Sequence, residues 1–497
     1  MTSERKPRSW RDRYGNTHEE LSAQAPTNTP SVPRVPGQLE LAWNEEDPDR
    51  ERLLREALFA DNPTVSPGSE DAEGRQYTWV VSEPFASSVL LLANGAFDPA
   101  DVEQSQFARL DGTGAWTLTL QMPDDWRASY RIAVWEGEQE PPWKAAAQDE
   151  VARAALDAAL PDPRCEEIMS VPAGRFSVVS GPEAQQQIWR SGVVGGGDAP
   201  GDGGGAFGGD AAGRDRADDG TGDGEPSLDV EAIAALHVDT LEFPEDDGPA
   251  RRVWVYRPPS ARPGADQSAG VDHLSAGVLP GDPSSDGGHP DDAAQTSDGE
   301  RTPVLILFDG QVWNEQIGLP ELLEAAISSG AIPPLHVAMV EAPNADERHE
   351  SLGVPGGQVD FVLDSLLDRL RAEYPVARGG EATIVAGQGQ GGLSALWALA
   401  LGEDAISHAI AQSPALWRFD VAQALLANGG WKSATIQAGR YEDSEGRALG
   451  LCQSLVEAVT SDPKLGNRSI GVEAVSGGHD WAWWRAGLFQ ALAAILS

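Results

Sequence analysis

The C-terminal half of the chain alternates short apolar runs with segments whose apolar residues recur at helical spacing. The first pattern is typical of buried strands, and the second is typical of helices that cover one face of a sheet. Predicted strands cover residues 303–308, 335–342, 383–387, 406–412, 434–439 and 469–475, and predicted helices cover 320–329, 358–373, 390–401, 420–427, 445–459 and 481–496. This order predicts a mostly parallel sheet with helices on both faces, and catalytic residues are expected at the carboxyl ends of its strands.

Residues 39–190 follow a different pattern, because Gly, Pro and Asp separate their apolar runs. One helix is expected over residues 39–60, and short runs rich in β-branched and aromatic residues come after it. In "WTLTLQM", residues 116–122, every second residue is apolar, which places one face of a strand inward. Such runs predict a small antiparallel β-sandwich domain in front of the α/β domain.

Three stretches lack the composition of a packed domain. Residues 1–38 are polar and rich in proline, residues 191–227 are almost all Gly, Asp and Ala, and residues 259–300 are rich in Gly, Pro, Ser and Asp. They contain too little apolar surface to offset the entropy of ordering the chain, so we expect a loose tail, a linker and a disordered insertion. A strand is predicted at 250–259, so the insertion is expected in a hairpin-like loop of a second domain that spans residues 228–497.

Charge and composition narrow the class of function. The formal net charge is −42, which repels phosphate backbones and anionic lipid, so neither nucleic acid nor a membrane is expected as a partner. The first residues lack the apolar core of a secretory signal, and the composition predicts a cytoplasmic protein. Cys165 and Cys452 are interpreted as reduced thiols. No His, Cys and carboxylate cluster has the spacing of metal ligands, so neither a metal nor a cofactor is expected.

A glycine-rich turn joins the predicted strand 383–387 to the helix 390–401. Its frame, "GQGQG" at residues 387–391, has the spacing of the nucleophile elbow G-x-S-x-G, with Gly389 where the serine would stand. A phosphate-binding glycine-rich loop is the rival interpretation. That interpretation would require an acidic residue at the end of the next strand, where Gln412 and Ser413 stand instead.

Two further strand ends carry residues suited to acyl transfer. His479 follows the last predicted strand, and Glu442 follows the strand before it, with Asp443 and Glu445 left open as alternative acids. The order elbow, acid, histidine is that of α/β-hydrolases, in which the acid orients the histidine and the histidine takes the proton of the nucleophile. The backbone N–H of Gln390 and those of "FDGQVW" at 308–313, Gln311 among them, are predicted to form an oxyanion hole.

The chain resembles the enterochelin (enterobactin) esterase family. The resemblance rests on "FDGQVW", "VAGQGQGGLSALWA", "SPALW" and "GGHDWAWWRAGL" in the second domain, and on "WTLTLQMPDDWRASYRI" and "RRVWVY" earlier in the chain. It implies an α/β-hydrolase-type, mostly parallel sheet preceded by an antiparallel β-sandwich domain, and hydrolysis of ferric catecholate siderophores in the cytoplasm, with iron only as part of the substrate.

The same resemblance assigns roles to individual residues. It makes His479 the general base, Glu442 the acid and position 389 the nucleophile, and it places Arg348, Arg485 and Trp313 at the substrate. Arginine suits a trianionic ferric catecholate, because it carries a fixed charge and stacks on aromatic rings. For Arg348, an ion pair with a neighbouring glutamate is the alternative, and the tryptophans that follow His479 are expected to pack the last helix.

Gly389 breaks the pattern of the family, because glycine has no side chain that can attack a carbonyl. Three hypotheses follow. The chain binds a siderophore with little or no hydrolysis, or it hydrolyses esters with another residue or a water activated by His479, or it is a non-enzymatic scaffold or carbohydrate-type binding protein that works through its sandwich. Substitutes for the serine are few: Ser394 is expected to face packing, Ser413 stands at the next strand end, and Cys452 falls within a helix.

Overall fold

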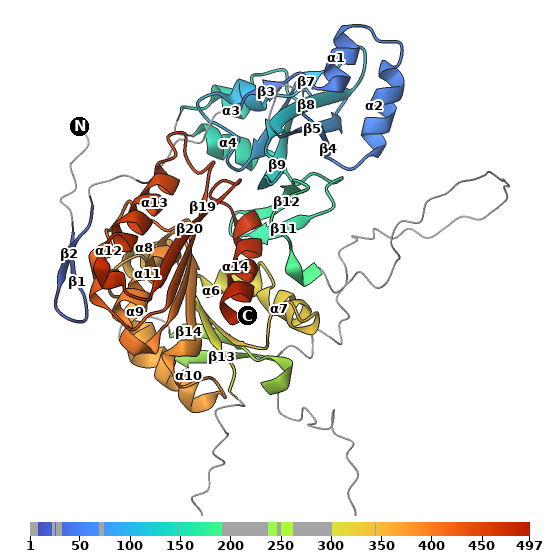
Figure 1. Ribbon diagram of the computed structural model, residues 1–497. Helices are drawn as coiled ribbons and strands as arrows, with labels where there is room; N and C mark the ends of the chain where they lie inside the picture. The colour runs from blue at the N-terminus through green and yellow to red at the C-terminus, as the bar shows by residue number, and fades with distance from the viewer. Residues whose placement is uncertain are drawn as a thin grey trace, which may run out of the picture.

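The computed structural model describes residues 8–21, 25, 32–68, 74–148, 150–190, 237–245, 250–261, 301–342 and 344–497. A smaller domain of strands sits over one end of a larger domain, in which helices flank a long sheet (Figure 1). The expected linker at 191–227 and nearly all of the expected insertion at 259–300 lie outside the described residues.

The smaller domain is the predicted β-sandwich. One sheet has the order β3-β8-β5-β4 with β7 beside β8, and the other has the order β10-β9-β12-β11 with β6 beside β9. All of these pairs are antiparallel. The strands are β3 (Arg34–Val35), β4 (Thr64–Pro67), β5 (Arg75–Ser82), β6 (Ser88–Ala93), β7 (Ala108–Arg109), β8 (Ala115–Met122), β9 (Arg127–Trp135), β10 (Ala159–Leu160), β11 (Ile168–Val171) and β12 (Gly174–Ser180).

Alternating residues from the two sheets fill the sandwich core. Trp79 on β5 and Leu118 on β8 pack against Leu91 on β6 and Tyr130 on β9. Short helices, α3 (Pro142–Ala145) and α4 (Val151–Asp157), lie beside this core. The predicted inward face of residues 116–122 is confirmed, since the alternate residues Trp116, Leu118, Leu120 and Met122 all join this core.

The single helix predicted over residues 39–60 is two helices. The helices α1 (Gln38–Asn44) and α2 (Arg50–Phe59) are separated by a turn in which Glu46 has φ 55° and Pro48 follows. A left-handed residue and a proline both interrupt a helix, and this turn chemistry outweighed the apolar spacing.

The larger domain contains the predicted α/β sheet. Its strand order is β13-β14-β16-β15-β17-β18-β19-β20. The pairs β13–β14 and β14–β16 are antiparallel, and the others are parallel. The strands are β13 (Val238–Phe243), β14 (Arg251–Tyr256), β15 (Val304–Leu307), β16 (His336–Val340), β17 (Thr383–Gln388), β18 (His408–Gln412), β19 (Ser433–Gly439) and β20 (Ser469–Val475).

Helices cover both faces of this sheet (Figure 1). On β15, Val304 and Ile306 join the core under one set of helices, whereas Leu305 and Leu307 join the core under α7 and α14 on the other face. Both faces of the central strands β15, β16 and β17 are buried, which is why these strands are nearly continuous apolar runs. The helices are α6 (Gly310–Glu315), α7 (Leu319–Ser328), α8 (Ala345–Ser351), α9 (Gln358–Phe361), α10 (Leu367–Glu373), α11 (Gln390–Leu401), α12 (Ala422–Ala427), α13 (Arg447–Thr460) and α14 (Trp481–Leu496).

The hairpin-like loop expected around the second low-complexity stretch is wrong. Strand β14 pairs with β13 and β16, and β16 separates it from β15, the next strand in the chain. The stretch therefore joins two strands that are not neighbours. Sequence order alone suggested a hairpin, because nothing local to 250–308 reveals that β16 inserts between them.

The loose tail expected over residues 1–38 is also wrong where the structure describes it. Strands β1 (Ser9–Arg11) and β2 (Thr17–Glu19) form an antiparallel hairpin beside the larger domain (Figure 1). Arg8 pairs with Glu350, and Glu20 accepts a hydrogen bond of 2.7 Å from the fully buried Arg418. The hairpin is held by contacts with another domain, which local composition cannot show.

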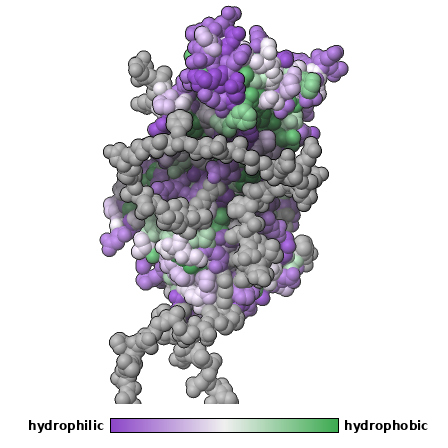
Figure 2. Space-filling view, turned by 90° about the vertical axis from the view of Figure 1, so that its right-hand side faces the viewer, coloured by the Kyte–Doolittle hydropathy of each residue, from purple (hydrophilic) through white to green (hydrophobic). Residues whose placement is uncertain are grey.

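The surface of the sandwich domain is mainly hydrophilic at its outer end (Figure 2). Hydrophilic residues dominate the outer end of the sandwich domain on the face drawn in Figure 2, and hydrophobic residues show there as smaller patches. Large apolar side chains with high exposure include Phe59, Phe85 and Leu160. No helix among the described residues has both the length and the apolar character that a bilayer-spanning segment requires.

A buried histidine makes the stability of the larger domain depend on pH. Burial, reinforced by the charge of Arg257, lowers the pKa of His336 from 6.5 to about 4, and its Nδ1 lies 2.6 Å from Thr302 Oγ1. Between these two pKa values the unfolded chain binds a proton that the folded chain does not. The free energy of unfolding should therefore fall as the pH drops from 6.5 towards 4, by up to about 3 kcal/mol from this residue.

Urea unfolding at about pH 7 and about pH 4.5 checks this expectation. The parent should lose more free energy of unfolding between the two pH values than His336→Gln does. Equal losses in the two proteins would show that His336 does not contribute.

Candidate active site

The nucleophile elbow is present, with glycine at its tip. Gly389 joins β17 to α11 with φ 57° and ψ −114°, and its N–H donates to Gln412 O at 2.9 Å. The neighbouring glycines permit a tight turn, because a Cβ on Gly387 would meet the backbone of Gly391 at 2.3 Å. A Cβ on Gly389 would meet only His479, so the turn has room for a side chain at its tip.

His479 and Glu442 form a hydrogen-bonded pair beside this turn. His479 Nδ1 lies 3.0 Å from Glu442 Oε2, and the carboxylate is 6% exposed while the imidazole is 53% exposed. Because a carboxylate only accepts hydrogen bonds, the neutral imidazole that makes this contact carries its proton on Nδ1 and has its lone pair on Nε2. An ideal Cβ at position 389 would lie 3.4 Å from Nε2, so the imidazole faces the place of a side chain at the tip of the turn.

The three candidate acids differ in their contacts with the imidazole. Glu442 contacts the imidazole, whereas Asp443 accepts hydrogen bonds from the N–H groups of Glu445, Arg447 and Ala448 at the start of α13. Glu445 is exposed. One of the three carboxylates thus lies beside the imidazole, one organises a helix start and one is a surface charge, and the catalytic role of Glu442 stays a prediction.

The sandwich domain holds the loop that carries His479. Asn94 Nδ2 donates to His479 O at 3.1 Å, and Ser129 N–H donates to Asp480 Oδ2 at 2.6 Å. Asp480 also caps α14 by accepting from Ala482 N–H, and burial raises the pKa of Asp480. The imidazole is thus fixed from both domains, which sequence reasoning did not foresee.

Ser413 and Trp484 support the acid. Ser413 Oγ donates to Glu442 Oε1 at 2.7 Å and accepts from Trp484 Nε1 at 2.9 Å, and Gly439 N–H donates to the same carboxylate oxygen. The Trp484 ring also lies edge-on to the His479 ring, with 4.6 Å between centroids. The position of Ser413 at a strand end was the available signal, but its role as a support depends on tertiary contacts.

The three side chains that were weighed as replacements for a serine nucleophile are hydrogen-bonded or buried. Ser394 is fully buried and accepts from Gly353 N–H, and Ser413 is held by the acid. Cys452 is buried, and burial together with the charge of Glu442 raises the pKa of its thiol to about 12, which keeps it protonated.

The two predicted oxyanion residues differ in their placement. Gln390 begins α11 and lines a cavity of about 350 Å³ together with Gly389, His479 and Arg348. The side chain of Gln311 forms two hydrogen bonds with the backbone of Ala342. Its Nε2 donates to the carbonyl oxygen at 2.7 Å, and its Oε1 accepts from the N–H at 3.0 Å. The use of their backbone N–H groups as an oxyanion hole stays a prediction.

Arg348 lies in the cavity, but a carboxylate already holds it. Its Nε and Nη2 donate to the two oxygens of Asp309 at 2.7 and 2.8 Å. Burial lowers the pKa of Arg348, and Asp309 outweighs this and raises it above its ordinary value. The ion pair expected as the alternative interpretation thus exists, with Asp309 as the partner instead of a neighbouring glutamate.

Arg485 and Trp313, which were predicted to contact the substrate, lie elsewhere. Arg485 is 7% exposed, pairs with Glu167 of the sandwich and lies over the Trp189 ring. Trp313 is fully buried, and its Nε1 donates to Gln388 Oε1 at 3.1 Å. Both side chains are therefore part of the packed interior. The motif could not show this, because packing sets the direction of a side chain at a strand end or a helix start.

A row of three buried glutamines that ends at an exposed glutamate underlies the site and was also missed. Gln388, Gln412, Gln437 and Glu473 are register neighbours on β17 to β20. Each glutamine donates to the next residue in the row, at 2.9, 2.8 and 2.8 Å. Glutamine at corresponding places in successive predicted strands was a visible signal. The row fixes the strand ends that carry Gly389 and Ser413.

A second cavity of about 470 Å³ lies between the domains and shares His479 and Glu442 with the first. Phe97 and Phe176 from the sandwich face Tyr441 and Trp481 from the larger domain across it. The two cavities meet at the imidazole, so a ligand larger than either can contact His479.

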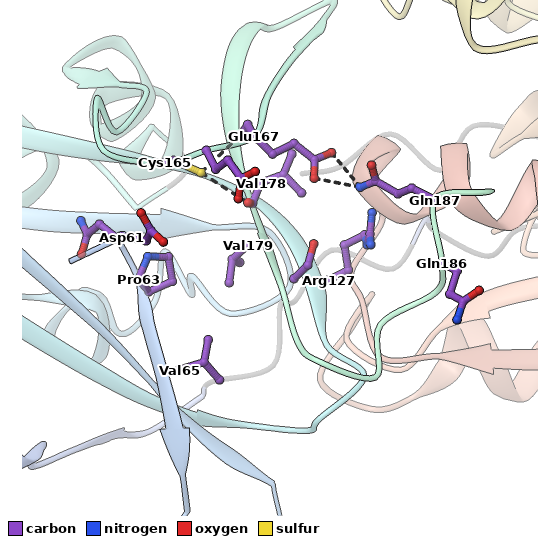
Figure 3. Close-up of a pocket in the computed structure, with 13 residues that line it drawn as sticks. Asp61, Pro63, Val65, Arg127, Cys165, Glu167, Val178, Val179, Gln186 and Gln187 are labelled. Atoms are coloured by element: carbon purple, nitrogen blue, oxygen red, sulfur yellow. Dashed lines mark hydrogen bonds between the residues drawn. The ribbon is translucent and has the colours of Figure 1, made fainter. Parts of the chain in front are cut away.

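A third cavity, of about 580 Å³, lies in the sandwich domain, and neither His479 nor Glu442 lines it (Figure 3). Cys165 and Glu167 line it, and Glu167 accepts hydrogen bonds from Gln187, which the figure marks. Burial raises the pKa of Cys165, so its thiol is protonated. Within the described ranges, no group of three or more His, Cys, Asp or Glu side chains is arranged to hold a metal ion.

The strand order, the elbow and the acid–histidine pair define an esterase-type α/β-hydrolase site with an additional N-terminal domain. Residues 79–190 match the family described as "Enterochelin esterase, N-terminal", and residues 289–495 match the family described as "Putative esterase". The chain belongs to the enterochelin esterase family.

Known relatives span both domains. The chain is 24% identical over 467 residues to an iron(III) salmochelin esterase of Escherichia coli O6:H1, covering 88% of this chain and 91% of that protein. It is 24% identical over 425 residues to an iron(III) enterobactin esterase of Dickeya dadantii, covering 80% of each. The enterobactin esterase of Shigella flexneri, crystallised in the presence of enterobactin, shares the fold with a TM-score of 0.59 at 18% identity, covering 88% of this chain and 96% of that one.

The backbone at position 389 favours glycine, which gives a measurable cost for any side chain there. Gly389→Ala should lower the free energy of unfolding by about 1–3 kcal/mol, because a residue with a Cβ is strained at positive φ. Gly450→Ala is the matched control, since Gly450 lies within α13 and a Cβ there meets nothing within 4 Å. It should stabilise by about 0.5–1 kcal/mol. Equal effects of the two substitutions in urea unfolding would contradict the strain at Gly389.

Proposed function

We propose that this protein binds siderophore esters of the catecholate class in the cavities that meet at His479, and that it acts on them in cytoplasmic iron release. The observation that carries the proposal is the His479–Glu442 pair, aligned with the nucleophile elbow in a chain that matches both domains of the family. Iron enters only as part of the substrate, and the proposal includes no resident cofactor.

The lining of the two cavities supports a ligand with aromatic arms. Phe97, Phe176 and Trp481 offer ring surfaces, and Arg131 lies over the Phe176 ring at 4.0 Å from its centroid. Arg348 lines the other cavity. Aromatic faces and guanidinium groups suit catechol rings that carry negative charge.

Binding without turnover is the second candidate function, and Gly389 favours it. An acyl-enzyme on the elbow requires a side-chain oxygen at position 389, which glycine does not have. A siderophore-binding protein of this kind would retain the cavities and the scaffold while it loses covalent catalysis.

Binding and turnover of ferric and iron-free enterobactin, measured side by side, test the proposal. Binding is followed by quenching of tryptophan fluorescence, and turnover by chromatography of the products. We expect binding by the parent, and turnover that falls by about 10²–10⁴-fold in His479→Ala, because the general base is removed. His237→Ala, a change at an exposed histidine, is the matched control and should alter neither quantity. A parent that binds neither form would contradict the proposed function.

The buried Asp309 should weaken the binding of the most negatively charged ligands. Asp309→Asn keeps the shape of the side chain, tolerates φ 58° and removes the charge that neutralises Arg348. Affinity for ferric enterobactin should rise by about three- to tenfold and more than for the iron-free form, and the gain should shrink at high salt.

Fluorescence titration measures this difference. Glu51→Gln, at an exposed position on α2, changes the net charge equally and serves as the control. The account of Arg348 is wrong if both variants shift the affinity by the same factor.

A further inference from the structure

The space at the tip of the elbow is bordered by a competent base. His479 Nε2 would lie 3.4 Å from a Cβ at position 389, so a serine there would place its hydroxyl against Nε2. A serine side chain has two non-hydrogen atoms, Cβ and Oγ, and glycine has neither. A water molecule has a single non-hydrogen atom and so needs less space than the two together. The place of the hydroxyl is therefore large enough for a water that donates a hydrogen bond to Nε2.

We propose that a water molecule bound at His479 Nε2 replaces the serine hydroxyl and attacks the ester carbonyl directly. This inference rests on the proposed function, because it assigns a mechanism to the same ligand at the same site. It makes the protein a single-displacement esterase that forms no covalent acyl intermediate.

The step balances with the groups present. The water oxygen forms a bond to the carbonyl carbon, and one of its protons passes to Nε2, which gives an imidazolium paired with the Glu442 carboxylate. The tetrahedral intermediate then expels the alcohol oxygen, and the proton on Nε2 passes to that oxygen. The products are a carboxylic acid and an alcohol, and His479 returns to its neutral form.

The groups that hold the base remain in place. Ser413 and Gly439 both donate to Glu442, and Asn94 holds the backbone of His479. Gln390 Oε1, on a residue that lines the same cavity, is a buried acceptor with no hydrogen-bond partner among the described residues. The site thus offers the water a fixed base and keeps a further acceptor nearby, as a bound water requires.

Kinetics and mass spectrometry of the full chain test the mechanism, with enterobactin and p-nitrophenyl butyrate as substrates. The parent should hydrolyse both esters without an initial burst, and its intact mass should show no acyl adduct during turnover and no adduct with a fluorophosphonate. His479→Ala should lower kcat by about 10²–10⁴-fold. A burst, or an acyl or phosphonyl adduct on any side chain, would overturn the proposal.

Gly389→Ala supplies a second test, because its methyl group would lie in van der Waals contact with His479 Nε2, in the place of the water, and adds no polar atom. Its kcat should fall at least tenfold while its affinity for iron-free enterobactin stays within about twofold of the parent value. An unchanged kcat would overturn the proposal. Gly389→Ser carries the same backbone strain and should restore turnover through a covalent route, with a burst and an adduct that the parent lacks.

The outcomes separate this inference from the proposed function. Enterobactin binding without hydrolysis by the parent overturns the water mechanism and leaves the siderophore ligand in place. Absence of both binding and hydrolysis overturns both proposals. Hydrolysis that depends on His479, with neither burst nor adduct, supports both.

Discussion

The position of one loop, between β20 and α14, determines the rest of the site. Sandwich residues fasten it at both ends, since Arg127 N–H donates to Ser476 O at 3.0 Å and Ser129 N–H donates to Asp480. Asn94 holds the carbonyl of His479 between them. The contact between the imidazole and Glu442 therefore depends on both domains, and sandwich residues line the cavity beside it.

Polar side chains beneath the site also hold its residues in place, from the side of the larger domain. The row of buried glutamines from Gln388 to Gln437, which ends at the exposed Glu473, ties four strand ends together, and Ser413 beside it donates to Glu442. Buried networks of this kind are costly when any member is unsatisfied, so their completeness favours one arrangement of the strand ends. Glycine at position 389 suits this arrangement, because glycine adopts the conformation of this turn most easily.

Sequence patterns predicted the features that depend on periodicity and order. The α/β sheet, the sandwich, the elbow at Gly389 and the pairing of His479 with Glu442 all follow from strand ends that share one edge of a sheet. The patterns failed where tertiary contacts decide. Arg485 and Trp313 pack against Glu167 and Gln388 and do not line the two cavities that share His479. The hairpin β1–β2 is held by contacts with the larger domain.

Local backbone chemistry accounts for a further difference, since Glu46 and Pro48 divide the predicted first helix into two. The insertion of β16 between β14 and β15 had no local signal at all. The contacts of Ser413 and Trp484 beside Glu442 also had no local signal, because residues 71 positions apart meet only after folding.

The central claim is that the catalytic machinery around position 389 is complete except for the nucleophile. Reaction of Gly389→Ser with a fluorophosphonate, followed by intact mass spectrometry, tests it most directly. The account predicts one adduct on Ser at position 389, formed rapidly, and slowed by about 10²–10⁴-fold when His479→Ala is added. A folded Gly389→Ser protein that forms no adduct would contradict the claim, because the base and the elbow would then not act together.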